Sequence, residues 1–138
     1  ERVRTFQNQS AERMRTLYAA CDVVLVPSLH LDPFPTVCLE AQACSRPVIA
    51  TRHGGAKEAV KDGVTGWIVD PKDKHAFAER LRWCTEHRGE LPSYGGAARR
   101  HVEEFFSLER YLQKLLAVYD EVCGAAASAA HAGSLLKQ

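Results

Sequence analysis

The chain has 138 residues, of which 46% are hydrophobic and 25% are charged, and its formal net charge is +1. This length suits one small domain with its own core. The mixed charge excludes a nucleic-acid-binding stripe and a polybasic membrane patch, and no apolar run approaches the roughly 20 residues that span a bilayer. We therefore expect no nucleic-acid partner and no transmembrane segment.

The five cysteines are odd in number and form no CxxC pair. This pattern suggests neither a disulfide framework nor a zinc site. It predicts reduced, mostly buried thiols in a cytoplasmic protein that holds no metal. The first residue is Glu1 rather than Met, which favours a fragment or a processed product.

The start of the chain predicts strand, helix and strand. VRTFQ (Val3–Gln7) alternates weakly between apolar and polar residues, as a short strand does. Ser10 suits the N-cap of a helix that runs to about Cys21. DVVLVP (Asp22–Pro27) is β-branched and almost free of polar residues, which is typical of a strand covered on both faces.

The middle of the chain repeats this alternation. TVCLEAQAC predicts a helix from about Thr36, with Pro35 at or just before its first turn. A strand PVIAT (47–51), a short helix AKEAV (56–60) and a strand WIVD (67–70) follow. Alternating strands and helices predict an α/β, Rossmann-like parallel sheet with helices on both faces.

Helices dominate the rest of the chain. One begins at Pro71–Asp73, and two more are expected over about Ser93–Phe106 and Leu108–Cys123, the last with an apolar stripe. We expect one domain over residues 1–123 and a flexible, low-complexity tail over 124–138.

Two acidic residues mark the segment after Asp22–Pro27. Ligands of parallel sheets bind outside the carboxyl ends of the strands, and Asp32 lies on such a loop. Glu40 lies in an apolar helix, where an unpaired buried charge would be costly. Either Glu40 makes a structural salt bridge or is simply exposed, or it accepts hydrogen bonds from a ligand diol.

The start of the same helix suits a phosphate. The free N–H groups of Thr36, Val37 and Cys38 lie at the positive end of the helix dipole, whereas Pro35 has no N–H to donate. A phosphate beside a diol describes a nucleotide sugar.

These motifs resemble the C-terminal, donor-binding domain of retaining glycosyltransferases of family 4, which have the GT-B fold. The resemblance runs from about Val3 to Cys123. The matching motifs are Asp32 with Glu40, Pro47–Ala50, Gly54-Gly55 with Glu58, and Gly63 with Gly66.

The resemblance implies a role for each matching residue. Asp32 would be the catalytic-site acid that contacts the transferred sugar, and Glu40 would accept the ribose hydroxyls. Gln7 and Asn8 would lie near the base.

The backbone would hold the rest of the donor. The N–H groups of Phe34, Thr36 and Val37 would bind the sugar and the diphosphate. Gly54 and Gly55 either let the backbone approach the donor closely or form only a strand-to-helix turn.

The implied reaction keeps the anomeric configuration, with front-face attack assisted by the donor phosphate, and it needs neither a metal nor a cofactor. Three departures from the family pattern stand out. Asp32 replaces the usual Glu, Pro33-Phe34-Pro35 replaces Gly-Phe-Gly, and Ser45 occupies a position that is usually Gly. A positive φ at Ser45 would strain the turn.

The resemblance also implies missing parts. The N-terminal acceptor domain is absent, and the C-terminal domain itself is incomplete, because two strands and a loop with Arg and Lys would precede this chain. The strand Asp22–Pro27 would then have an unpaired apolar edge. We expect little or no activity from the chain alone, and a membrane contact only through the missing domain.

Two alternatives remain open at this point. One is a non-catalytic nucleotide-sugar-binding or interaction module of the same fold. The other is a related GT-B enzyme such as an epimerase or a phosphorylase. His30 and His53 suit surface positions better than a general base, and Trp67 and Trp83 suit a core or an interface better than a stacking platform.

Overall fold

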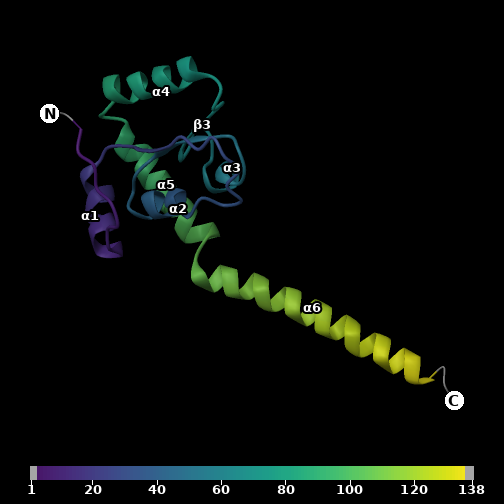
Figure 1. Ribbon diagram of the computed structural model, residues 1–138. Helices are drawn as coiled ribbons and strands as arrows, with labels where there is room; N and C mark the ends of the chain where they lie inside the picture. Colours follow the sequence, from purple (N-terminus) through teal and green to yellow (C-terminus); the bar gives the residue numbers. More distant parts are fainter. Residues whose placement is uncertain (1–2, 136–138) are drawn as a thin grey trace. The chain divides into compact units, whose positions relative to one another are not determined.

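The computed structural model describes residues 3–135, with side chains up to residue 124. The described residues divide into two compact units, one up to residue 104 and one from residue 105. Figure 1 shows the elements in chain order, from α1 to α6. The first unit contains the sheet and the candidate site.

Three parallel strands form the sheet of the first unit, in the order β1 (Val24–Val26), β2 (Val48–Thr51) and β3 (Gly66–Val69). Leu25 pairs with Ile49, and Ile49 pairs with Trp67. Every residue of β2 is buried, whereas β1 is an edge strand among the described residues. The predicted parallel α/β fold is therefore confirmed.

Three helices pack against one face of the sheet. They are α1 (Ala11–Ala20), α2 (Thr36–Ala43) and α3 (Ala56–Ala59). The core on this face consists mainly of small side chains, namely those of Cys38, Ala41, Val48, Ala50, Ala56, Ala59 and Val60, together with Tyr18. Small side chains let α2 and α3 lie close to the strands and close to each other.

Two helices pack against the other face, α4 (Lys74–Glu86) and α5 (Leu91–Phe105). This core is aromatic. The Trp67 and Trp83 rings meet edge to face with centroids 5.3 Å apart, and Tyr94 packs on Trp67 at 4.8 Å. Trp67 is only 4% exposed and belongs to this core, and Trp83 is half-buried and packs against it, so neither is an exposed stacking platform, as expected.

The predicted strand Val3–Gln7 is wrong. These residues have no regular secondary structure and are exposed. A strand is stable only when a neighbouring strand satisfies its backbone hydrogen bonds, and no described strand pairs with this segment.

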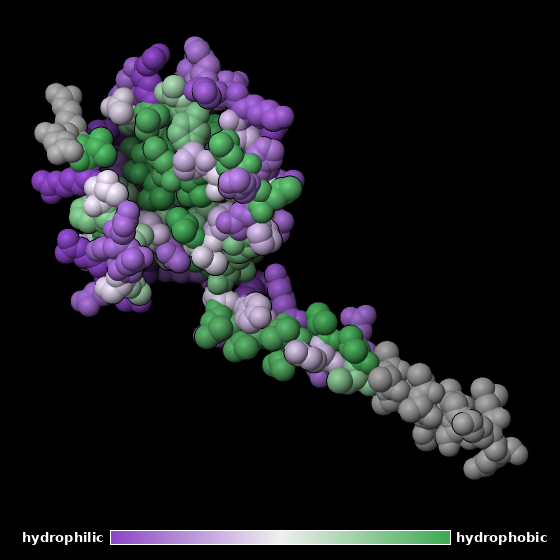
Figure 2. Space-filling model, in the orientation of Figure 1, coloured by the Kyte–Doolittle hydropathy of each residue, from purple (hydrophilic) through white to green (hydrophobic). Residues whose placement is uncertain are grey.

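Figure 2 shows apolar side chains gathered on the face of the first unit that is turned toward the viewer.

The predicted helix boundaries are otherwise close to those observed. Ser10 caps α1 as expected, accepting a hydrogen bond from the amide of Arg13. Asp73 likewise caps α4. Both caps satisfy amides that have no partner within the helix.

The second unit consists mainly of α6 (Leu108–Leu135). Its predicted apolar stripe is largely exposed, as at Leu108 and Val122. The helix continues past Gly124, where a tail was expected to begin, and residues 136–138 of that tail lie outside the described residues. Within the described part of the chain, no helix is both long and apolar enough to span a membrane.

Candidate functional site

The loop before α2 is held by the side chain of Asp32. Its Oδ1 accepts a hydrogen bond of 3.0 Å from the amide of Phe34, which makes a compact turn. The amide of Phe34, predicted to bind the donor, therefore already has an acceptor within the chain. The other carboxylate oxygen of Asp32 accepts no hydrogen bond from the described residues, and Asp32 is half-buried.

The Gly-Gly turn packs directly on this loop. The amide of Gly55 donates to the carbonyl of Asp32 at 2.9 Å. A Cβ on Gly54 would lie 1.9 Å from that carbonyl oxygen, and a Cβ on Gly55 would lie 2.0 Å from the carbonyl oxygen of Pro33. Gly54 also has a φ of +69°. A close approach of the chain to itself therefore requires both glycines.

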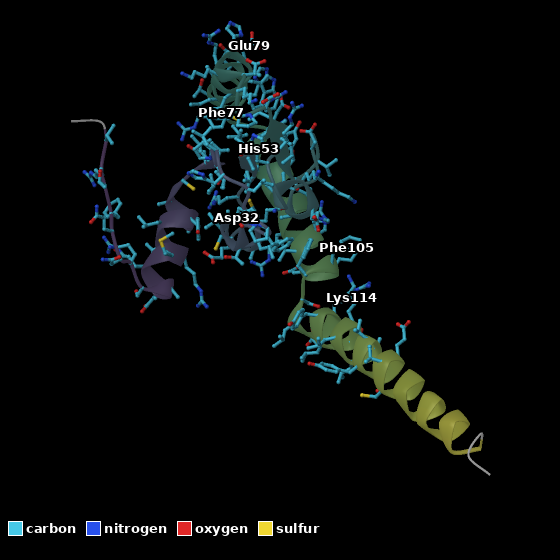
Figure 3. All side chains as sticks on the ribbon, turned by 45° about the vertical axis from the view of Figure 1, so that its right-hand side comes forward. Asp32, His53, Phe77, Glu79, Phe105 and Lys114 are labelled. Carbon is cyan, nitrogen blue, oxygen red and sulfur yellow. The ribbon has the colours of Figure 1, made fainter. Side chains whose placement is uncertain are left out.

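Figure 3 labels Asp32 and His53, which lie on the two loops that this contact joins. His53 is half-buried and His30 is exposed. Among the described side chains, no group of three or more His, Cys, Asp and Glu residues is arranged to hold a metal ion.

The first turn of α2 presents two free amides. Pro35 occupies the N-cap, and the amide of Cys38 donates to its carbonyl at 3.0 Å. Thr36 and Val37 are exposed, and within the described residues neither amide has an acceptor. Burial, and to a lesser degree the charge of Asp32, raises the pKa of the Cys38 thiol to about 11. Asp32 therefore lies near this end of the helix.

Glu40 is exposed, which is one of the alternatives that the sequence left open. Its carboxylate has a partner that the sequence did not reveal. The hydroxyl of Tyr18, on α1, donates a hydrogen bond of 2.9 Å to Glu40 Oε2. The alternative of a structural salt bridge is not observed for Glu40 among the described residues.

A cavity of about 450 Å³ lies between α1 and α2, and Glu40 lines it. The other lining residues are Gln9, Ala11, Met14, Arg15, Tyr18, Ala43 and Cys44. Asp32 is not one of them. Because α2 rises 1.5 Å per residue, Glu40 lies about 6 Å along the helix from Thr36, one turn further from the loop that carries Asp32.

The structure also places the residues predicted to lie near the base. Gln7 and Asn8 are exposed and do not line this cavity in the described structure, whereas the next residue, Gln9, does. Asn8 has a φ of 51°, and the chain turns at this residue, between Gln7 and Gln9. Gln9 and Arg15 were not singled out from the sequence, because nothing in their spacing distinguishes them from ordinary surface residues of a helix start.

The end of α2 is a Schellman motif. The amide of Arg46 donates to the carbonyl of Ala41 and the amide of Ser45 donates to the carbonyl of Gln42. Ser45 has a φ of 57°, so the positive φ that would strain this turn is present. A serine thus occupies a conformation that favours glycine.

Gln42 is a further residue that the sequence did not single out. It is fully buried, and its side-chain amide donates to the carbonyls of Cys38 and Ala59 at 3.1 and 2.9 Å. It therefore ties α2 to α3, beside the Gly-Gly turn. A glutamine within an apolar helix was the available signal, since a buried amide needs partners.

Comparison with known proteins identifies the family. Residues 1–101 match the family model described as "Glycosyl transferases group 1". The D-inositol 3-phosphate glycosyltransferase of Geodermatophilus obscurus is 44% identical over 123 residues, covering 87% of this chain and 26% of that protein. The enzyme of the same name from Salinispora tropica is 40% identical over 121 residues, covering 88% of this chain and 25% of that protein.

Solved structures agree with this result. Sucrose-phosphate synthase from Thermosynechococcus elongatus superimposes with a TM-score of 0.79 at 31% identity, covering 88% of this chain and 30% of that one. Anabaena HepE in complex with UDP-glucose superimposes with a TM-score of 0.70 at 30% identity, covering 76% and 29%.

The chain spans about a quarter of the length of the curated relatives it matches. Its α/β architecture is that of the GT-B transferases among its structural neighbours. The family match, the identities and the superpositions together show that this chain belongs to the group 1 glycosyltransferase family.

Proposed function

We propose that this chain is the donor-binding part of a retaining, family 4 glycosyltransferase that uses a nucleotide-diphosphate sugar. The observation that carries the proposal is the layout of α2. Its first turn offers the unpaired amides of Thr36 and Val37, and Glu40 presents an exposed carboxylate about one turn later. Amides at a helix start suit a diphosphate, and a carboxylate suits a ribose diol.

Asp32 lies on the loop that precedes this helix start. Its Oδ1 is engaged by the amide of Phe34, and in the proposal its other oxygen contacts the hydroxyls of the transferred sugar. The ribose contact at Glu40 and the sugar contact at Asp32 then flank the diphosphate. This order matches the covalent order of a nucleotide sugar.

In the proposed reaction the acceptor oxygen attacks the anomeric carbon from the face that the diphosphate leaves. The bond from the anomeric carbon to the phosphate oxygen breaks, the glycosidic bond forms, and a diphosphate oxygen takes the acceptor proton. The amides of Thr36 and Val37 stabilise the charge that develops on the leaving diphosphate. The proposal involves neither a metal nor a cofactor.

The relatives support a nucleotide-sugar donor. The superimposed Anabaena protein binds UDP-glucose in its own structure, and two further structures of it hold UDP with glucose and UDP alone. We further propose that an N-terminal acceptor domain outside this chain completes a cytoplasmic enzyme, called the full-length enzyme below.

The chain alone then transfers little or no sugar. Calorimetry with a nucleotide sugar tests this point, because the proposed diphosphate and acceptor contacts are incomplete. Binding at micromolar strength by the isolated chain would show that the parts outside it are dispensable for holding the donor.

Two alanine variants of the full-length enzyme test the catalytic proposal. We expect Asp32→Ala and Glu40→Ala each to lower transfer on the order of 100-fold. The loss in Glu40→Ala should appear chiefly as a higher KM for the donor, and the loss in Asp32→Ala chiefly as a lower kcat. Glu86→Ala removes an exposed carboxylate of α4 and serves as the control. Wild-type turnover in both site variants would rule out the enzyme proposal.

A non-catalytic nucleotide-sugar-binding module is the second candidate. It is favoured by one observation, the use of Asp32 Oδ1 and the Phe34 amide by the chain itself. Such a module would bind a nucleotide sugar in the full-length protein but would catalyse neither transfer to an acceptor nor release of free sugar.

A further inference from the structure

Tyr18 lies at an unusual position for a tyrosine hydroxyl. Only 6% of the residue is exposed, and its ring belongs to the core formed with Cys38 and Ala41 of α2. Its hydroxyl nevertheless reaches the exposed carboxylate of Glu40 at 2.9 Å. A rigid, buried ring on α1 is therefore attached to a flexible, exposed side chain on α2.

The direction of this hydrogen bond is fixed. Burial, then the hydrogen bond and the charge of Glu40, raise the pKa of Tyr18 well above its usual value. The hydroxyl thus keeps its proton throughout the neutral range and donates it. The carboxylate can only accept, so its Oε2 faces α1.

The remaining acceptor positions of Glu40 stay available. Oε1 accepts no hydrogen bond from the described residues, and the side chain lines the cavity between α1 and α2. A free glutamate side chain has three rotatable bonds and samples many orientations, so that a ligand must order it on binding. A carboxylate already held at one oxygen presents the other in one direction.

We propose that Tyr18 is a positioning residue, which holds Glu40 in the orientation that accepts the ribose hydroxyls of the nucleotide. This inference rests on the proposed function, since it assigns the role of Glu40 to ribose. It adds a residue from α1 to a site otherwise formed by α2 and its preceding loop. It also makes recognition of the ribose depend on the packing of α1 against α2.

Ribose discrimination tests the inference in the full-length enzyme. The ligands are the tightest-binding of UDP, GDP and ADP, and the 2′,3′-dideoxy form of the same nucleotide. The ratio of their two dissociation constants, measured by calorimetry, reports the contribution of the diol alone. We expect Glu40→Ala to bring this ratio close to one, and Tyr18→Phe to lower it about tenfold.

A purely structural role of Tyr18 predicts a different result. Loosening of α1 would weaken the binding of both nucleotides equally and leave the ratio of their dissociation constants at its wild-type value. Tyr94→Phe is the matched control, because Tyr94 packs in the other core, against Trp67 and Trp83. It should leave the ratio unchanged.

The double variant sharpens the test. If Tyr18 acts through Glu40, then Tyr18→Phe in the Glu40→Ala background has no further effect on the ratio. Should Tyr18→Phe fail to fold, as judged by thermal melting, Glu40→Asp replaces it. That variant keeps the charge and withdraws the carboxylate from the Tyr18 hydroxyl by one methylene, and it should lower the ratio as well.

The outcomes separate the two proposals. A wild-type ratio in Glu40→Ala, or no binding of any of the three diphosphates, would overturn the proposed function. A ratio near one in Glu40→Ala together with a wild-type ratio in Tyr18→Phe would overturn the role of Tyr18 alone.

Discussion

The two acidic positions of the site are held by different means. Asp32 lies on a loop that is fixed by main-chain contacts, since the Gly54-Gly55 turn presses against its carbonyl and that of Pro33. Glu40 lies on an exposed helix surface and is oriented by a single side-chain hydrogen bond from Tyr18. The loop of Asp32 depends on two residues that have no side chain, Gly54 and Gly55, whereas the orientation of Glu40 depends on the side chain of Tyr18.

This difference predicts how each region responds to change. A backbone contact cannot be adjusted by a small side-chain movement, so a substitution at the glycines displaces the whole loop. A side-chain hydrogen bond can be removed without moving the backbone. The sugar end of the proposed donor site is therefore rigid, whereas the ribose end can be altered one residue at a time.

The largest effect is expected at Gly54. Gly54→Ala adds a Cβ within 1.9 Å of the Asp32 carbonyl oxygen at a φ of +69°. Strain at positive φ and overpacking together should lower the free energy of unfolding by roughly 2–5 kcal/mol. Denaturant unfolding of the full-length enzyme measures this loss.

Gly63→Ala is the control for that measurement. Gly63 has a similar φ of +71°, but a Cβ there would meet nothing within 4 Å. Its loss should be only about 1–2 kcal/mol, the part due to φ. Equal losses in the two variants would mean that the loop moves to accommodate the Cβ added at position 54. The region around Asp32 would then not be rigid.

A smaller effect is expected at Asp32 itself. Asp32→Ala removes the acceptor of the Phe34 amide and should lower the free energy of unfolding by about 1 kcal/mol, as the loss of a cap does. Asp32→Asn keeps an acceptor oxygen and should be nearly as stable as the wild type, while it loses the charge. If Asn and Ala destabilise equally, this hydrogen bond does not hold the loop.

The architecture could be predicted from the sequence because it follows from hydrophobic pattern and turn chemistry. The β-branched strands, the N-cap Ser10 and the Gly-Gly turn all lie where local rules place them. The positive φ at Ser45 could also be anticipated, since the family pattern has glycine there. Each of these features depends on residues close together in the sequence.

The remaining features depend on contacts between distant residues. Tyr18 has the spacing of a core residue of α1, and nothing local indicates that its hydroxyl reaches Glu40, 22 positions later. The segment Val3–Gln7 has the pattern of a strand, but a pattern does not supply a neighbouring strand. The reason for both glycines at 54 and 55 became clear only from the loop that they contact.

The alkaline limit of stability probes the start of α2. Cys38 is buried, and its pKa of about 11 exceeds the ordinary value of 9.0. The folded state therefore holds the thiol proton more tightly than the unfolded state. The resulting stability is complete below pH 9.0 and is lost as the pH rises toward about 11.

Thermal melting at neutral pH and near about pH 10 should therefore show a smaller alkaline loss in Cys38→Ala than in the wild type. Tyr18, Cys21 and Cys84, whose pKa values are also raised, contribute to the loss in both proteins. An identical alkaline loss in both would show that Cys38 is solvated, and that the start of α2 is looser than the loop around Asp32.

The smallest effect is expected at the end of the same helix. Ser45→Gly relieves the strain of a φ of 57° in the Schellman motif, but glycine also loses more conformational freedom on folding. The two terms nearly offset each other, so the free energy of unfolding should rise by at most about 1 kcal/mol. Ribose discrimination should stay at its wild-type value, because Tyr18, and not the end of α2, orients Glu40. A change in that discrimination would mean that the helix end also sets the direction of the carboxylate, and that the ribose end of the site depends on the backbone as the sugar end does.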